Sequence, residues 1–108
     1  MVKRIGQVIQ LKPDKAELYK KLHASPWSEV NDMIKACNIS NYSIFYRDGL
    51  LFSYFEYTGD DYEADMAKMA ADPKTQEWWS VCKPCMIPVS TAGTNDWWAD
   101  MEPFFYLE

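Results

Sequence analysis

His23 is the only histidine in the chain, and histidine is the side chain whose unperturbed pKa lies close to neutral pH. Tyr19 precedes it by four residues, a spacing that places both side chains on one face of a helix. Trp27 follows His23 by four residues, but Pro26 intervenes, so the shared face is not extended to Trp27. The spacing predicts a proton-transfer group in an aromatic cleft, and the alternative is a histidine with a purely structural role.

Two pairs of adjacent tryptophans, Trp78–Trp79 and Trp97–Trp98, form the second feature. Neighbouring residues on a helix point about 100° apart, so Trp78 and Trp79 cannot both occupy one core position. We expect one of them to line a pocket or interface, where an aromatic face can stack on a sugar and an indole N–H can donate to a hydroxyl. The alternative is that both only pack. Trp97–Trp98 follows a predicted loop, which favours packing or a subunit contact.

Cys82 and Cys85 are separated by two residues, a spacing shared by redox dithiols and by half of a zinc site. We expect neither, because the pair follows a predicted helix whose C-terminal dipole opposes thiolate formation. A zinc site would also have to recruit Cys37 and His23, which supply no second paired spacing. The sequence therefore predicts no metal and no cofactor.

The composition describes one compact domain over residues 1–108, without a membrane span or a nucleic-acid surface. The net charge of −5 opposes phosphate binding, and no apolar run reaches the roughly 20 residues that a membrane helix needs. The acidic residues Asp60, Asp61 and Asp65 lack a metal-binding spacing and are expected to begin a helix and face solvent. The N-terminus has no signal-peptide pattern, and three cysteines fit reduced thiols, so we expect a cytoplasmic protein.

Periodicity and turn residues define the expected elements. Apolar alternation predicts a strand over 5–11, and Pro13 and Asp14 begin a helix. Ser25 and Pro26 are expected to cap and begin a second one. The expected helices span about 13–24, 26–37 and 60–72, and the last of them restarts at 72–73 and ends at 84. A hairpin turns at 48–49 and a loop covers 86–96. A last strand can form within 99–108, where the proline at 103 would confine it to a sheet edge or its start.

The order βαββαβ predicts a ferredoxin-like α+β fold, an antiparallel sheet with its helices on one face. Phe45, Phe52, Tyr54 and Phe55 place large apolar side chains on both faces of the hairpin. A sheet covered by helices on one face only leaves the other apolar face in water. We therefore expect a homodimer in which two sheets pack together, a dimeric α/β barrel, with one pocket between the sheet and helices of each subunit.

Several separated blocks of the chain also resemble the L-rhamnose mutarotase family, along nearly its whole length. The matching blocks are RIGQVIQLKPDKAELYKKLH, PWSEV, ISNYSIFYRDGLLFSYFEY, TQEWW and FFYLE, in this order. Ser28 departs from the pattern, because family members usually have proline after the tryptophan, and this concerns helix initiation beside the pocket. The final block varies around Tyr106, to which we assign no role.

The resemblance implies a dimeric barrel that interconverts the α and β anomers of L-rhamnose. It makes His23 the catalytic acid and assigns sugar binding to Tyr19, Tyr42, Trp78 and Trp79. Mutarotation needs a proton delivered to the ring oxygen and one removed from the anomeric hydroxyl, and a group with a pKa near 7 suits both steps. The base stays open between Tyr19, Tyr42, a carboxylate and water.

Three alternatives remain at this stage. The sugar is L-rhamnose or a related deoxy sugar such as L-fucose, since the sequence does not display the hydroxyl contacts. The same fold also serves haem-degrading or cofactor-free monooxygenases, although an acidic chain without an obvious basic cluster argues against haem propionates. A module that binds a sugar or another metabolite without catalysis is the third alternative.

Overall fold

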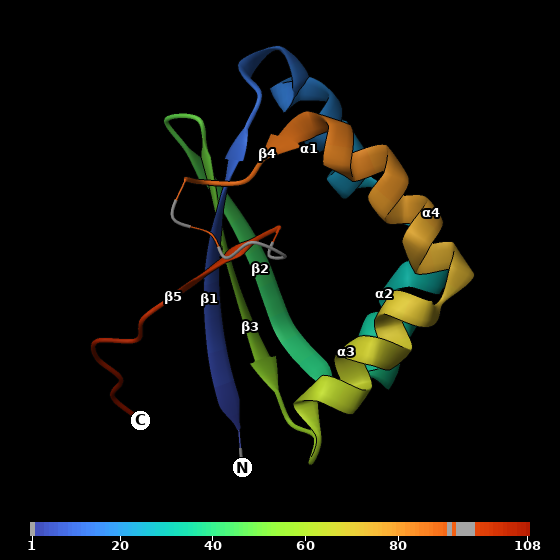
Figure 1. Ribbon diagram of the computed structural model, residues 1–108, viewed down its shortest axis with the longest axis vertical. Coiled ribbons are helices and arrows are strands. Elements are labelled where there is room, and N and C mark those ends of the chain that lie inside the picture. Colours follow the sequence, from blue (N-terminus) through green and yellow to red (C-terminus); the bar gives the residue numbers. More distant parts are fainter. Residues whose placement is uncertain (1, 91, 93–96) are drawn as a thin grey trace.

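The computed structural model describes residues 2–90, 92 and 97–108. A curved sheet forms one layer and the helices form the other, all on the same side of the sheet (Figure 1). The elements are β1 (Lys3–Leu11), the 3-10 turn η1 (Pro13–Lys15), α1 (Ala16–Ala24), α2 (Ser28–Ala36), β2 (Ile39–Arg47), β3 (Leu50–Tyr57), α3 (Tyr62–Ala71), α4 (Pro73–Cys82), the 3-10 turn η2 (Lys83–Cys85), β4 (Met86–Ile87) and β5 (Ala99–Met101).

The sheet has the strand order β2-β3-β1-β4, and β5 also pairs with β1. All of these pairings are antiparallel. The hairpin between β2 and β3 turns at Asp48 and Gly49, whose φ angles of 52° and 79° are those of the tight turn that this dipeptide favours. The predicted ferredoxin-like α+β fold is confirmed.

The last strand lies within the predicted region 99–108 and occupies only its start, since β5 ends at Met101 before Pro103, which has no N–H to donate to a ladder. The predicted loop 86–96 was wrong at its start, where Met86 pairs with Leu11 in the short strand β4. Strand β4 has only two residues, which is too few to show the alternation of a strand before the prolines and small residues that follow. Residues 91 and 93–96 of that loop lie outside the described residues.

The helix starts follow the expected capping chemistry at two of three positions. Asp61 accepts a hydrogen bond from the backbone N–H of Ala64 at the start of α3, and Asp72 caps α4 in the same way. The predicted cap at Ser25 was wrong, because Ser25 ends α1 and α2 begins only at Ser28. The intervening Trp27 has an extended backbone and packs edge-to-face against a tryptophan of α4, at a ring separation of 5.1 Å.

Strand β3 shows why the sheet is apolar on both faces. Its buried residues alternate and face the helices: Leu51, Ser53, Phe55 and Tyr57. The other face carries Phe52, which lies opposite Phe45 of β2, and Phe45 is 59% exposed. The expected two-faced hairpin is therefore present, and its outer face is not covered by the helices.

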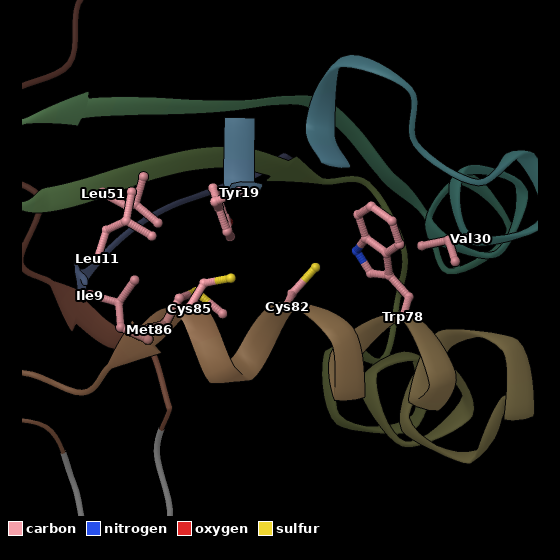
Figure 2. Packing of buried hydrophobic residues seen from close by; sticks show 9 residues of the cluster. All are labelled: Ile9, Leu11, Tyr19, Val30, Leu51, Trp78, Cys82, Cys85 and Met86. Atoms are coloured by element: carbon pink, nitrogen blue, oxygen red, sulfur yellow. The ribbon is translucent and has the colours of Figure 1, made fainter. Parts of the chain in front are cut away.

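The larger core cluster lies between β1, β3, α1 and α4. It contains Ile9, Leu11, Tyr19, Val30, Leu51, Trp78, Cys82, Cys85 and Met86. Figure 2 shows Trp78 and Cys82 projecting from α4 toward the sheet, and Leu51 lying on the sheet side of the same cluster. Among the described residues, no helix combines the length and the apolar character needed to cross a bilayer.

Candidate active site

A cavity of about 780 Å³ lies between the inner face of the sheet and the helices. Four of the five residues singled out from the sequence line it: His23, Tyr42, Trp78 and Trp79. They come from α1, β2 and α4, which are remote from one another in the sequence. The volume falls within the usual range for small-molecule sites. Aromatic and aliphatic residues form most of its wall, and the polar remainder includes Lys35 and Lys83. This mixture suits a small ligand that has both apolar and hydroxyl-bearing faces.

His23 is held at the end of α1 by three contacts. Its Nδ1 lies 2.9 Å from the backbone oxygen of Tyr19, and its ring stacks on the Tyr19 ring at a centroid separation of 4.1 Å. Trp78 meets the imidazole edge-to-face at 5.3 Å. A carbonyl oxygen can only accept, so the Nδ1 atom carries a proton and Nε2 is the nitrogen left for exchange with a ligand.

Burial lowers the pKa of His23 below its ordinary value, and the hydrogen bond to the Tyr19 carbonyl opposes this shift. The imidazole is therefore mainly neutral at pH 7, with its proton on Nδ1. When Nε2 does gain a proton, the imidazolium is a stronger acid than free imidazolium. This is the state that a general acid needs.

Tyr19 does not line the main cavity. It lies behind His23 and faces a second hollow of about 630 Å³ that it shares with His23. Burial, followed by the nearby ionisable groups of Tyr42, Cys82 and Cys85, raises the pKa of the Tyr19 phenol far above its ordinary value. The observed contacts therefore give Tyr19 a positioning role toward the imidazole, and its predicted sugar contact stays a prediction.

Tyr42 and the tryptophans form much of the aromatic wall. Tyr42 is 41% exposed, and part of that surface faces the cavity it lines. Burial of its phenol, with a smaller effect of Tyr62, raises the pKa of Tyr42 to about 12. Trp78 is only 7% exposed and belongs to the core cluster, whereas Trp79 is half-buried. Both tryptophans line the cavity, which satisfies the expectation that at least one of them would.

Sequence reasoning missed most of the cavity wall, including three residues that carry hydrogen-bonding or aromatic groups. Trp97 and Trp98 pack against the core as expected, but they also line the cavity. Gln7 lines it too, from the middle of β1. The signal for Gln7 was available, because it is a polar residue between the buried apolar residues Ile5, Ile9 and Leu11 of the inward-facing series of β1.

The cysteine pair has the placement expected from the sequence. Cys82 ends α4 and is buried, as is Cys85, and both are free thiols. Burial raises the pKa of Cys82 to about 12, so a reactive thiolate is not available at neutral pH. Asp65 is engaged structurally, since it accepts hydrogen bonds from Tyr57 and Asn38. Among the described residues, no group of His, Cys, Asp or Glu side chains has the arrangement of a metal site.

The helices on one face of an antiparallel βαββαβ sheet, with an aromatic cavity and a histidine between the layers, define a ferredoxin-like α+β protein of the dimeric α/β barrel class. A family model described as L-rhamnose mutarotase matches residues 4–107. The chain belongs to the L-rhamnose mutarotase family.

Individual relatives agree with this membership. An L-rhamnose mutarotase of Listeria monocytogenes is 32% identical over 108 residues, covering 98% of this chain and 99% of the relative. The crystal structure of an L-rhamnose mutarotase from Formosa agariphila has a TM-score of 0.76 at 24% identity, covering 98% of this chain and 99% of that chain. Tetracenomycin F2 cyclase from Streptomyces glaucescens, a type-II polyketide cyclase, reaches 0.72 at 17% identity, with 98% and 97% covered, and shares the fold.

Proposed function

We propose that this protein is an L-rhamnose mutarotase, which interconverts the α and β anomers of the sugar with His23 as the proton-transfer group. The observation that carries the proposal is the His23 imidazole, which has a fixed tautomer and stands in the wall of a sugar-sized aromatic cavity. Membership of the family supplies the substrate. Trp78, Trp79 and Tyr42 line the same cavity and would hold the sugar by stacking and hydroxyl contacts.

The proposed reaction moves protons and breaks one bond. Protonated Nε2 of His23 donates to the ring oxygen while a base removes the proton of the anomeric hydroxyl. The C1–ring oxygen bond breaks, an open-chain aldehyde forms, C1 rotates, and the reverse transfers close the ring on the other face. Each group regains its starting protonation state in the cycle, and the chemistry needs no metal, nucleotide or redox cofactor.

The raised pKa values of the two tyrosines narrow the choice of base. A phenolate of Tyr19 or Tyr42 would be a rare species at neutral pH. Both phenols instead serve as hydrogen-bond donors in their usual protonated form. A carboxylate or a water molecule is therefore the base in this scheme, and Tyr19 orients His23 through its ring and its backbone carbonyl.

The functional unit in this proposal is a cytoplasmic homodimer of single-domain subunits, each formed by residues 1–108. The support for a dimer is the outer face of the sheet, where Phe45 and Phe52 lie opposite each other and the described part of the chain provides no covering layer. Apolar side chains follow at the C-terminus, where Phe104 is 91% exposed. A second copy of the sheet would remove both surfaces from water.

Saturation-transfer NMR tests the function directly. When the C1 proton of one L-rhamnose anomer is saturated, the saturation is transferred to the C1 proton of the other anomer at the exchange rate. Added protein should accelerate this transfer in proportion to its concentration. L-fucose and other aldoses in the same series establish the specificity. Sugar binding without faster exchange would indicate a non-catalytic binding module, and a Soret shift on mixing with haemin would indicate the monooxygenase alternative.

A further inference from the structure

A row of polar side chains crosses the inner face of the sheet on three adjacent strands. In the antiparallel registers, Gln7 of β1 lies directly opposite Ser53 of β3 on one side and Asp100 of β5 on the other. The inward-facing neighbours of Gln7 along β1, Ile5 and Ile9, are buried and apolar. The row runs from the buried Ser53 through the half-buried Gln7 to the exposed Asp100, and its buried polar groups are costly unless they are hydrogen-bonded.

Gln7 is half-buried, lines the cavity and is fixed at one end. Its Nε2 donates to Oδ1 of Asp100 at 2.8 Å, which holds the plane of the amide. Within the described part of the chain, the Oε1 atom of Gln7 receives no hydrogen bond. Because Nε2 is committed to Asp100, Oε1 is the amide atom left to accept a hydrogen bond from a ligand in the cavity that Gln7 lines.

Two further polar atoms have no hydrogen-bond partner among the described residues. One is the hydroxyl of Ser53, which is 3% exposed and lies opposite Gln7 in the strand register. The other is the buried indole N–H of Trp97, a residue that lines the same cavity as Gln7. Buried polar groups in folded proteins are nearly always satisfied. Of these groups, the Gln7 acceptor and the Trp97 donor belong to residues that line one cavity, which indicates a ligand that both gives and accepts hydrogen bonds, as sugar hydroxyls do.

We propose that Gln7 is a specificity-determining residue, whose Oε1 accepts a hydrogen bond from one hydroxyl of the sugar, and that Asp100 is its positioning residue. This inference rests on the proposed function for the class of ligand. Gln7 therefore reads the configuration of one carbon of the sugar, while the aromatic wall holds the ring irrespective of that configuration.

Binding of L-rhamnose and its monodeoxy analogues to Gln7→Leu tests this assignment. Calorimetry should show about a five- to tenfold loss of affinity for L-rhamnose, the size of one lost hydrogen bond. One analogue, which lacks the hydroxyl that Gln7 reads, should bind the wild type and the variant equally. The matched control is Gln10→Leu, the same change on the opposite face of β1, which should bind like wild type.

Asp100→Ala separates positioning from contact and leaves the cavity wall in place. It should weaken L-rhamnose binding in the wild type but have little further effect in the Gln7→Leu background. The assignment is overturned if folded Gln7→Leu binds every sugar like wild type, or if it loses the same affinity for all analogues. If Gln7→Leu does not fold, an unchanged affinity of Asp100→Ala for L-rhamnose overturns the assignment. A wild type that binds these sugars without exchanging their anomers overturns the proposed function and leaves this assignment standing.

Discussion

The backbone carbonyl of Tyr19 accepts a hydrogen bond from Nδ1 of His23 at 2.9 Å, while the ring of the same tyrosine stacks on the imidazole at 4.1 Å. One residue thus fixes both the tautomer and the orientation of the imidazole. The spacing of four residues along α1 makes this possible, because one helical turn brings the carbonyl and the ring of Tyr19 beneath the His23 side chain.

Replacing His23 with asparagine should remove most of the catalysed anomer exchange. Asparagine retains a polar group of similar size but cannot cycle a proton, so we expect a loss of about 10²-fold or more. Sugar binding should survive better than turnover, because the aromatic wall is intact. Saturation-transfer NMR measures the rate and calorimetry the affinity; a folded His23→Asn protein that exchanges anomers at the wild-type rate would make the histidine structural.

The pH dependence of the catalysed exchange rate should reflect the lowered pKa of His23. If the imidazolium donates the proton, kcat rises as the pH falls from 8 toward a pKa below 6.5 and then levels off. The rise should be absent in His23→Asn. A rate that falls over this range would instead identify the neutral imidazole as a base.

The lowered pKa of His23 also predicts how the stability of the folded protein changes with pH. Because its pKa is lower in the folded protein than in the unfolded chain, the unfolded chain binds the proton first as the pH falls. Wild-type stability should therefore decrease as the pH drops below about 6.5, the ordinary value, and this component should be missing in His23→Asn. Urea midpoints of both proteins at pH 7.5 and pH 5.5 measure the difference, and equal decreases would contradict the shift.

Alanine variants of Trp78 and Trp79 should differ in their effects on stability and on sugar affinity. Trp78→Ala removes a 7% exposed ring that contacts His23 and Trp27, so we expect about 3–5 kcal/mol of destabilisation. Trp79 is half-buried in the same cavity wall, and Trp79→Ala should weaken L-rhamnose binding at a smaller cost in stability. Thermal denaturation and calorimetry measure the two effects. Unchanged sugar affinity in both variants would reduce the pair to packing residues.

Light scattering at micromolar concentration should report about twice the 12.6 kDa chain. Phe45→Glu, on the outer face of the sheet, should shift the protein toward monomers, because it places a charge in the proposed interface. Leu18→Glu is the matched control, since Leu18 is similarly exposed but lies on α1 in the helical layer. A monodisperse wild-type monomer, or equal effects of the two changes, would contradict a dimer formed through the sheets.

Local patterns in the sequence determined the order of the elements and the turn chemistry. The alternation in β1, the Asp48–Gly49 turn and the caps at Asp61 and Asp72 depend on neighbouring residues only, so they could be predicted without the fold. The Tyr19–His23 pair was predictable for the same reason. The tryptophan pair Trp78–Trp79 stood out in the sequence by itself, whereas the family resemblance added Tyr42 and connected all three residues to His23.

Only the tertiary structure decided what lies around the imidazole and in the cavity. Two short strands, β4 and β5, both pair with β1, and neither is long enough to show a period in the sequence. Helix α2 begins at Ser28, after Trp27, which packs against Trp78. It also brought Asp100 to Gln7 across 93 residues of chain. Such pairings depend on strand register and on the closure of the layers, which are long-range properties that a single sequence does not display.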